Sequence, residues 1–298
     1  KGPPWYDCNT GEELPTEEVE KAMDKERASL KEFEVYTPKT KKQYEEILRS
    51  GAKVTLVKTA WVISRRKQGV KARLVGQELA DGSHPDELFC PTPRQTSHRI
   101  VLAQAQRRGW EVHQGDVKTA FLHTPVTGET VMVVPPKTDV TEEHPFWMIH
   151  RWLYGFRASP RKFSDHFAKQ GATFGWKRAR GDPQPFFNSR YEGAVMSVHT
   201  DDILFTCRPE DAEQVQKELS SKMRILWEGK IGKEWQRFLG VEWCRKKRGF
   251  VCRVNANYFK KLLDEWQLGK AKKAATPFGP TRKRDEESEF VDAQTHRR

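Results

Sequence analysis

The sequence has no hydrophobic run long enough to cross a membrane, and no apolar stretch follows its basic start. A membrane-spanning helix needs ~18 or more consecutive apolar residues, so we expect neither a membrane span nor a secretory signal. The five cysteines are scattered, and no two of them form a C-x-x-C pair. This spacing excludes a disulfide framework and a zinc knuckle, and it favours a reducing, intracellular location. A Walker-type phosphate loop and a nucleophile elbow are also absent.

Negative charge is scarcer than positive charge. The 298 residues include 53 Lys and Arg against 41 Asp and Glu, which gives a formal net charge of +12. Such a balance favours a polyanionic partner, with nucleic acid as the first choice. Basic clusters at residues 65–67 and 246–248 are expected in turns between strands. They could bind phosphates without reading sequence, or they could simply be solvated turns.

The residue pattern predicts an α+β protein, with an antiparallel sheet and helices on one face. A charged helix over residues 17–36 has an apolar stripe of Val19, Met23, Leu30 and Phe33. Further helices are expected over residues 42–50, 97–108, 209–223 and 258–266. Another should begin at Ser159 as the N-cap, with Pro160 as its first helical residue.

Runs rich in β-branched and aromatic residues predict the strands. A basic turn should join a hairpin over residues 54–64 and 70–77, and a strand over residues 110–121 should turn at Gly115-Asp116. Residues 81–96 hold three prolines and are expected to form a loop. The remaining strands are expected over residues 130–134, 147–154, 186–190, 193–199, 203–207, 238–245 and 250–254.

Three carboxylates stand out in this arrangement. Asp116 lies near the end of a predicted strand, and Asp201 and Asp202 lie at the tip of a hairpin with two apolar arms. Two adjacent like charges are costly to hold there. Ordinary turn chemistry is one explanation, because Asp is a common turn former. A divalent metal site is the other, because carboxylates together with substrate phosphates bind Mg²⁺.

The surroundings of the carboxylates form an ordered series of motifs. They are K-A-R-L-V at 71–75, D-V-K-T-A-F at 116–121, L-Y-G-F-R-A-S-P at 153–160, T-D-D at 200–202 and F-L-G-V-E at 238–242. In this order and spacing, residues 55–278 resemble the reverse transcriptase of copia-type LTR retrotransposons. The resemblance implies a right-hand polymerase fold, with fingers, palm and part of a thumb around an antiparallel palm sheet. It implies an N-terminal helical extension at 1–53, a reverse transcriptase domain at 54–278 and a charged, disordered tail at 279–298.

The same resemblance assigns the chemistry. Asp116, Asp201 and Asp202 match the catalytic carboxylates that hold two Mg²⁺ ions, with Mn²⁺ as an alternative. One ion would activate the primer 3′-hydroxyl, and the other would hold the triphosphate and neutralise the leaving pyrophosphate. The expected activity is that of an RNA-directed DNA polymerase. A two-metal nuclease would use similar carboxylates, but it would not explain the L-Y-G-F-R-A-S-P motif.

Other motif residues match nucleotide and primer contacts. Lys71 and Arg73 would grip the triphosphate from one face of a strand. Phe121 matches an aromatic steric gate against a 2′-hydroxyl, with core packing as the alternative, and Tyr154 matches a loop that closes over the nucleotide. The residues matched to primer or template contact are His199, Phe238, Leu239 and Gly240.

His199 and Thr200 depart from the family pattern, which usually has an aromatic and a bulky apolar residue before the paired Asp. On a continuous strand, His199 and Asp201 would face the same side. Nearby carboxylates are then expected to raise the pKa of His199, and its protonated form would compete with metal. The alternative is that His199 packs where the family has an aromatic ring.

The expected partners are an RNA or DNA template with its primer, and dNTPs, with no membrane. The family's polyprotein also carries integrase and ribonuclease H, and no motif of either is visible here. The expected location is intracellular, in cytoplasmic virus-like particles or the nucleus. The competing hypothesis is a decayed, inactive relic that still binds nucleic acid. The three carboxylates favour the enzyme, whereas His199-Thr200 and the end of the sequence near the ribonuclease H linker favour the relic.

Overall fold

The computed structural model describes residues 4–78, 90, 95–180 and 184–271. The chain divides into two units, Lys1–Cys252 and Arg253–Arg298. In the described part of the second unit, helix α7 (Ala256–Glu265) begins after Asn255, whose side chain accepts a hydrogen bond from the Asn257 backbone N–H. No helix in these described ranges is long and apolar enough to cross a membrane.

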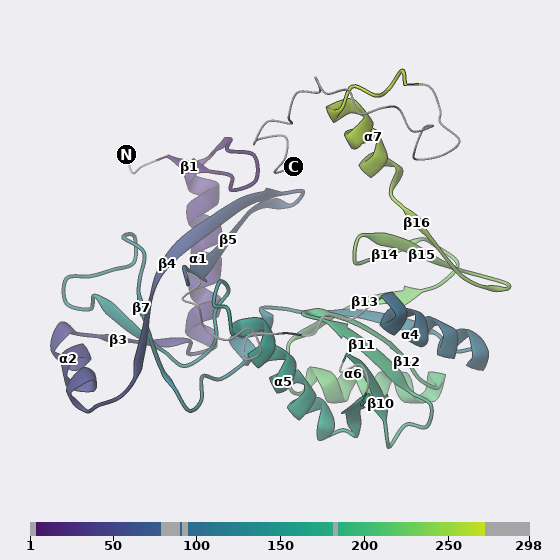
Figure 1. Ribbon diagram of the computed structural model, residues 1–298, viewed down its shortest axis with the longest axis horizontal. Helices are drawn as coiled ribbons and strands as arrows, with labels where there is room; N and C mark the ends of the chain where they lie inside the picture. Colours follow the sequence, from purple (N-terminus) through teal and green to yellow (C-terminus); the bar gives the residue numbers. More distant parts are fainter. Residues whose placement is uncertain (1–3, 79–89, 91–94, 181–183, 272–298) are drawn as a thin grey trace, which may run out of the picture. The chain divides into compact units, whose positions relative to one another are not determined.

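An antiparallel six-stranded sheet forms the larger core of the first unit (Figure 1). Each pair of neighbouring strands is antiparallel. The strands, in spatial order, are β13 (Ile225–Ile231), β6 (Val112–Val117), β12 (Asp202–Thr206), β11 (Val195–His199), β10 (Pro185–Asn188) and β9 (Trp176–Arg178). The antiparallel sheet expected from the sequence is therefore confirmed.

Helices cover both faces of this sheet, so the expectation of helices on one face is wrong. Met196 and Phe205 are register partners and share a cluster with side chains of α5 (Ser159–Ala172) and α6 (Ala212–Ser220). Val195 and Leu204 belong to another cluster, together with side chains of α4 (Gln95–Arg108). The central strands β11 and β12 are buried at almost every position. Because both faces are apolar, each needs a covering layer.

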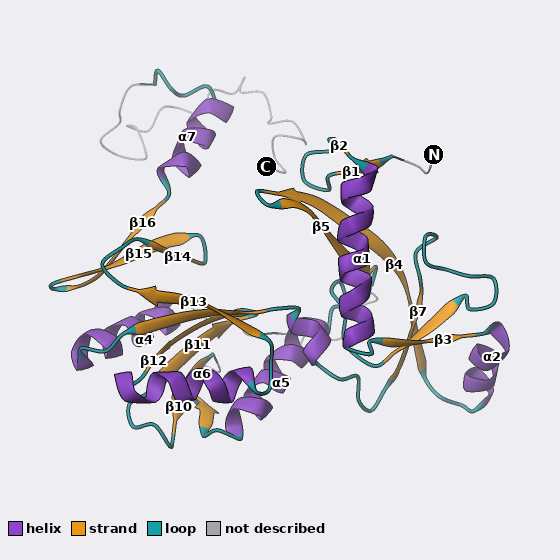
Figure 2. Cartoon of the chain, turned by 180° about the vertical axis from the view of Figure 1, so that it is seen from behind, coloured by secondary structure: helices purple, strands orange, loops and turns teal. Residues whose placement is uncertain are grey.

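A five-stranded sheet forms the second layered part of this unit. Its order is β3 (Tyr36–Lys39), β8 (Phe146–Ile149), β7 (Thr130–Val134), β4 (Val54–Arg66) and β5 (Gly69–Gly76). The predicted hairpin is confirmed as β4 and β5, whereas β4 and β7 run parallel. Figure 2 shows helix α1 (Thr16–Glu32) running along the β4–β5 ribbon.

Residues before β4 are integrated into this part of the fold. Helix α1 ends earlier than predicted, and Tyr36 begins strand β3. Helix α2 (Lys41–Arg49) begins with a capping box between Thr40 and Gln43, which satisfies two backbone donors at once. The short strands β1 (Trp5–Tyr6) and β2 (Glu13–Leu14) pair with each other. The proposed division at residue 53 stays a prediction.

A three-stranded sheet follows the six-stranded sheet. It consists of β14 (Gln236–Phe238), β15 (Val241–Lys246) and β16 (Gly249–Val254). The strand predicted over residues 238–245 is split, because Leu239 and Gly240 have φ values of 49° and 78°. These left-handed conformations form the turn between β14 and β15. The predicted turn at residues 246–249 is confirmed between β15 and β16.

Gly115 has a different role from the one predicted. Strand β6 runs straight through Gly115-Asp116, and the chain turns only afterwards, into the 3₁₀ helix η1 (Ala120–His123). A Cβ on Gly115 would lie 2.7 Å from the Trp227 ring. Glycine therefore permits the close approach of β13, a strand that the sequence pattern did not reveal.

Ser159 also departs from its predicted role. Ala158 is the N-cap of α5, and the Ser159 hydroxyl donates a hydrogen bond to the Leu153 carbonyl at 2.5 Å. The buried Ser159 hydroxyl therefore stabilises the loop that precedes α5 and does not cap the helix. The strand predicted over residues 147–154 ends at Ile149. The helix predicted over residues 209–223 is the 3₁₀ helix η2 (Pro209–Asp211) followed by α6. Most of the predicted loop at 81–96 and the tail at 279–298 lie outside the described residues.

Candidate active site

The three predicted carboxylates come together at one end of the six-stranded sheet. Asp116 lies next to the last residue of β6, and Asp202 begins β12. In the strand register, Asp202 is the partner of Asp116. Asp201 lies in the two-residue turn before β12, and its carbonyl accepts a hydrogen bond from the Val117 backbone N–H at 2.7 Å. The two-metal assignment requires these three residues to lie close together, and the strand register brings their backbones to the same end of the sheet.

Burial and mutual repulsion shape the electrostatics of these carboxylates. Burial raises the pKa of Asp202 to about 6, and the charges of Asp201 and Asp116 add to this effect. Burial also raises the pKa of Asp201, with a further contribution from Asp116. Both carboxyl groups are therefore harder to ionise than an exposed Asp.

Lys118 supplies one positive charge to the cluster. Its Nζ forms an ion pair with the Asp116 carboxylate. The two residues are two positions apart along the strand direction, and this spacing places side chains on the same face. Lys118 was not among the predicted site residues, although its spacing from Asp116 in the sequence was a usable signal.

The chemistry of this donor set suits a hard divalent cation, because carboxylate oxygens are the ligands that Mg²⁺ prefers. A bound cation would favour the ionised forms of Asp201 and Asp202, whose pKa values are raised by burial and by the neighbouring carboxylates. Within the described ranges, no group of three or more His, Cys, Asp or Glu side chains is gathered into a ready metal-binding cluster. In this arrangement, Asp116 is engaged by Lys118 instead.

Three of the four residues predicted to contact the nucleotide touch one another, and the fourth, Lys71, interacts with Arg73 electrostatically. Arg73 lies with its guanidinium 5.1 Å from the centre of the Tyr154 ring. The Tyr154 ring contacts Phe121 edge-on, with 4.7 Å between ring centres. Burial lowers the pKa of Lys71, and so does the like charge of Arg73, whereas Asp116 opposes the shift. The basic strand and the carboxylates therefore interact electrostatically.

Two glycines hold the L-Y-G-F loop against β5. The Gly76 backbone N–H donates to the Tyr154 carbonyl at 2.7 Å. Gly155 has φ 82°, and a Cβ there would lie 2.1 Å from the Gly76 carbonyl oxygen. A Cβ on Gly76 would lie 2.7 Å from the Phe156 ring. The loop can approach this closely only without side chains at these positions, and the approach brings Tyr154 to Arg73.

Phe121 is buried, with 7% of its surface exposed. Besides Tyr154, it contacts the Phe163 ring of α5, with 6.1 Å between ring centres. The Phe121 ring is thus part of the apolar core, and it also contacts Tyr154, another residue predicted to contact the nucleotide. Its role as a steric gate stays a prediction.

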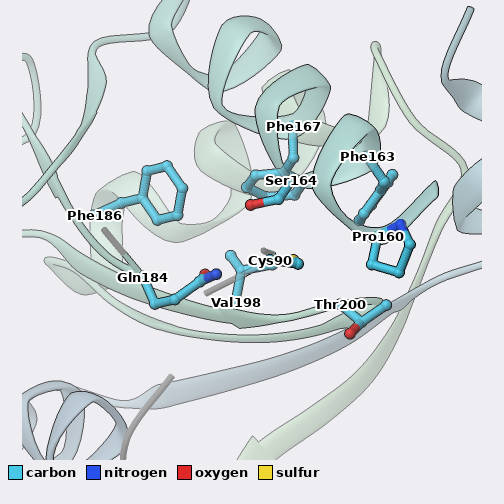
Figure 3. A pocket seen from close by; sticks show the side chains of 9 residues that line it. All are labelled: Cys90, Pro160, Phe163, Ser164, Phe167, Gln184, Phe186, Val198 and Thr200. Carbon is cyan, nitrogen blue, oxygen red and sulfur yellow. The ribbon is translucent and has the colours of Figure 1, made fainter. Parts of the chain in front are cut away.

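A small apolar recess adjoins the carboxylate turn (Figure 3). Thr200 lies at one side of the recess, and Pro160, Phe163 and Phe167 of α5 face into it. Its lining is mostly aromatic and aliphatic, which suits packing of the turn against α5 more than binding of a charged nucleotide.

The expectation of a raised pKa for His199 is wrong. Burial lowers the pKa of His199, and the opposing effect of Asp201 is smaller. Its Nδ1 atom is buried without a hydrogen-bond partner. Strand β11 ends at His199, and Thr200 has φ 54°. The strand alternation expected to place His199 and Asp201 on one face is therefore broken, and His199 pairs with Asp202 instead.

The residues predicted to contact the primer differ in exposure. Phe238 is 2% exposed and contacts the His98 ring, with 5.2 Å between ring centres. Leu239 is 38% exposed in the turn that it forms with Gly240. Phe238 is therefore a core residue that anchors the turn, and Leu239 is the residue that the turn presents. Primer contact at these positions stays a prediction.

Glu26 was missed by the sequence analysis. It is a buried residue of α1, and its Oε2 accepts a hydrogen bond from Arg73 Nη1 at 2.9 Å. A signal was available, because Glu26 occupies the position between Met23 and Leu30 in the apolar stripe. A charged residue at a helical core position needs a partner.

Comparison with known proteins identifies the family. The family model described as reverse transcriptase (RNA-dependent DNA polymerase) matches residues 44–280. The chain belongs to the reverse transcriptase family. Among curated relatives, the Retrovirus-related Pol polyprotein from transposon RE1 of Arabidopsis thaliana is 30% identical over 242 residues, covering 77% of this chain and 16% of the relative. The corresponding polyprotein from transposon TNT 1-94 of Nicotiana tabacum is 27% identical over 234 residues, covering 74% and 17%.

Two solved structures also match, both of telomerase. The Candida albicans telomerase with a fragment of telomeric RNA has a TM-score of 0.45 and 9% identity, over 83% of this chain and 53% of that chain. The Candida tropicalis apo telomerase has a TM-score of 0.45 and 7% identity, over 85% and 63%.

The resemblance to copia-type reverse transcriptases is therefore confirmed, and with it the α+β, right-hand polymerase fold of the family. We call the six-stranded sheet the palm sheet and the β4–β5 ribbon the fingers hairpin. The chain spans 16% to 17% of the length of these curated relatives. Its reverse transcriptase match includes all of the predicted site residues but not helix α1.

Proposed function

We propose that this reverse transcriptase domain transfers a deoxynucleotide to a primer 3′-hydroxyl, as an RNA-directed DNA polymerase with two Mg²⁺ ions. The pairing of Asp116 with Asp202 across β6 and β12 carries the proposal, together with Asp201 in the adjoining turn. Three carboxylates from two distant parts of the sequence share one end of the palm sheet. The raised pKa values of Asp201 and Asp202 support a cation between them.

Asp116, Asp201 and Asp202 would hold the two ions, and Mn²⁺ is an alternative to Mg²⁺. When bound, such ions stabilise the attacking and leaving oxygens of a phosphoryl transfer. Metal binding favours the ionised carboxylates, so it would lower the raised pKa of Asp202. The ion pair between Lys118 and Asp116 would have to break before Asp116 could bind a metal ion. The Lys118 ammonium group would then be available to a phosphate oxygen.

The fingers hairpin provides the proposed triphosphate contacts. Lys71 and Arg73 lie two positions apart on β5, and Arg73 is held over the Tyr154 ring. A guanidinium can bind two phosphate oxygens at once, whereas an ammonium acts as a point charge. The Tyr154–Phe121 pair would then lie against the sugar of the incoming nucleotide.

The proposed partners are an RNA or DNA template with its primer, and dNTPs. Integrase and ribonuclease H are proposed partners in a longer polyprotein. The relatives described above are Pol polyproteins, and this fact and the net charge of +12 support these proposals.

Primer extension on poly(rA)·oligo(dT) tests the polymerase proposal. The wild-type chain is expected to add dTMP with Mg²⁺ and not with EDTA. Asp116→Asn removes one carboxylate and is expected to lower the rate ~10³-fold or more. Asp165→Asn is the matched control, because Asp165 pairs with Arg161 and Arg178 on the surface, and its extension rate should stay unchanged.

Two results would count against the enzyme. Equal extension rates for wild type and Asp116→Asn would show that the reaction does not need the Asp116 carboxylate. A wild-type chain that binds primer–template but extends nothing would instead support the inactive relic.

A further inference from the structure

Glu26 is a buried carboxylate in the apolar stripe of helix α1. Only 4% of its surface is exposed, and the neighbouring stripe positions hold Val19, Met23 and Leu30. Helix α1 precedes residues 44–280, which match the reverse transcriptase family model. The family match alone therefore assigns no role to this helix.

The Glu26 carboxylate lies against β5. It accepts a hydrogen bond from Arg73 Nη1 at 2.9 Å, and the backbone N–H of the next residue, Leu74, also lowers its pKa. The Arg73 side chain is only 25% exposed, so little water competes for the pair. Burial raises the pKa of Glu26, and the positive charge of Arg73 opposes that effect. Glu26 and Arg73 thus depend on each other for charge compensation.

Arg73 is also held from its other side. Its guanidinium lies 5.1 Å from the centre of the Tyr154 ring, and such a cation–π contact fixes the position of the charge over the ring. A guanidinium has five N–H donors in a rigid fork. With Nη1 bonded to Glu26, the remaining fork can face a phosphate group while the side chain keeps one orientation.

Stability alone does not explain a carboxylate at this position. Buried ion pairs are often no more stabilising than well-packed apolar side chains of similar volume. An apolar residue would continue the stripe of Val19, Met23 and Leu30 at lower cost. We propose that Glu26 is a positioning residue, which holds Arg73 in the orientation that binds the triphosphate of the incoming dNTP.

The neighbourhood of Tyr154 indicates what Arg73 would do without Glu26. The pKa of Tyr154 is raised mainly by burial; Arg73 opposes this effect, and Asp201, Glu26 and Asp116 add to it. Arg73 therefore lies within the electrostatic reach of the carboxylates at the end of the palm sheet. An Arg73 released from Glu26 would be attracted toward those carboxylates and away from the triphosphate. This inference rests on the proposed polymerase function, because that function brings a dNTP to Arg73.

Equilibrium binding of dTTP tests the inference without any chemistry. The full chain is bound to poly(rA)·oligo(dT) whose primer ends in a dideoxynucleotide, and dTTP is titrated in by calorimetry with Mg²⁺. Glu26→Gln keeps an acceptor for the Leu74 N–H but removes the charge that orients Arg73. We expect it to raise the Kd for dTTP about tenfold, and Glu26→Asp to raise it less.

A double-mutant cycle separates positioning from general damage. Arg73→Ala should weaken dTTP binding, and adding Glu26→Gln to it should have no further effect. Additive effects in the double variant would overturn the proposal. The double variant also leaves no unpaired buried charge, so it remains informative if Glu26→Gln alone folds poorly.

Glu218→Gln is the matched control. Glu218 is a buried carboxylate of α6, 8% exposed, and it pairs with Arg190 at 3.0 Å. Its substitution should lower the thermal midpoint but leave the Kd for dTTP unchanged. If Glu218→Gln and Glu26→Gln raised the Kd for dTTP equally, Glu26 would only stabilise the fold, and the positioning proposal would be wrong.

The result is distinguishable from a failure of the polymerase proposal. A chain that binds dTTP with the expected Glu26–Arg73 dependence but does not extend primers would retain the positioning role and lose the enzymatic one. A wild-type chain that does not bind dTTP would overturn both.

Discussion

Asp202 and Asp116 are direct partners in the register of the antiparallel strands β12 and β6. The two carboxylates come from segments that are far apart in the sequence, and Asp201 adds a third from the adjoining turn. The fold therefore concentrates negative charge at one end of the palm sheet. Such an arrangement has consequences for stability that can be measured without any enzymatic assay.

Asp202→Asn should stabilise the metal-free protein at pH 7.5. The pKa of Asp202 is about 6 in the folded chain, against 3.8 for the ordinary group. Between these values the folded chain binds a proton that the unfolded chain releases, so stability falls as pH rises through this window. The Asn side chain does not titrate, so the variant avoids that loss. We expect its free energy of unfolding to exceed that of wild type by ~1–3 kcal/mol at pH 7.5, and the difference to shrink toward pH 4. Thermal unfolding in EDTA at both pH values measures it.

The control for this experiment is Asp165→Asn, whose carboxyl has the opposite shift. Hydrogen bonds from Arg161 and Arg178 lower the pKa of Asp165 against the opposing effect of burial. Its substitution should therefore not stabilise the protein at pH 7.5. Added Mg²⁺ should raise the thermal midpoint of wild type more than that of Asp202→Asn. A wild-type protein that is more stable than Asp202→Asn in EDTA at pH 7.5 would contradict the charge-repulsion argument.

Phe121→Val should weaken discrimination against ribonucleotides. The ring is buried between Tyr154 and Phe163, so its truncation should also cost ~1–3 kcal/mol of stability. The measurement is the ratio of kcat/KM for dTTP and UTP on the same primer–template. Phe163→Val is the control. Phe163 is a neighbouring core ring on α5, and it is not one of the residues predicted to contact the nucleotide. If both variants lose stability and neither changes the ratio, Phe121 only packs.

His199 should be neutral from pH 7 to pH 8. Burial lowers its pKa below the ordinary 6.5, and Asp201 only partly offsets this. For a lowered histidine pKa, the stability contribution is present above pH 6.5 and is lost as pH falls, since the unfolded chain takes up the proton first. An NMR titration of the imidazole should give a midpoint below 6.5. Wild type and His199→Tyr should have coincident pH–rate profiles, and a histidine-dependent step in wild type alone would restore the idea of competition with metal.

Nucleic-acid affinity should depend steeply on salt through the basic turns. Lys247 and Arg248 are exposed between β15 and β16, and Lys67 is exposed between β4 and β5, next to the exposed Arg66 at the end of β4. Each phosphate contact contributes ~0.9 to the slope of log K against log salt for a B-form duplex. Replacing Lys246, Lys247 and Arg248 by Gln should lower that slope by up to ~3. Fluorescence anisotropy with a labelled primer–template at several salt concentrations measures the slope.

Lys41 and Lys42 provide the control for that charge removal. Both are exposed on helix α2, away from the two turns in the sequence. The variant with Gln at both positions loses two positive charges, against three in the turn variant, and should leave the slope unchanged. An equal decrease in both variants would show that net charge matters and that the turns do not.

The sequence by itself determined which parts of the fold depend on local pattern. The β4–β5 hairpin, the β11–β12 hairpin and the helices follow from short-range alternation and helical spacing, which act within a few residues. The order of the motifs also identified the family, because motifs are defined by residue types and spacing and need no three-dimensional structure. The positions of Asp116, Asp201 and Asp202 in that order predict the candidate site without any geometry.

The tertiary structure alone decided what depends on close approach between distant segments. Gly115 admits the Trp227 ring of β13, although its sequence context predicted a turn. Helices cover both faces of the palm sheet, because β11 and β12 are apolar on both sides. The sign of the His199 pKa shift was decided by burial, which outweighs one nearby carboxylate. The partner of Glu26 lies on β5, and nothing in a helical stripe specifies which strand will cover it. In each case the energy comes from atoms that meet only after folding, so residue pattern along the chain carries no record of the contact.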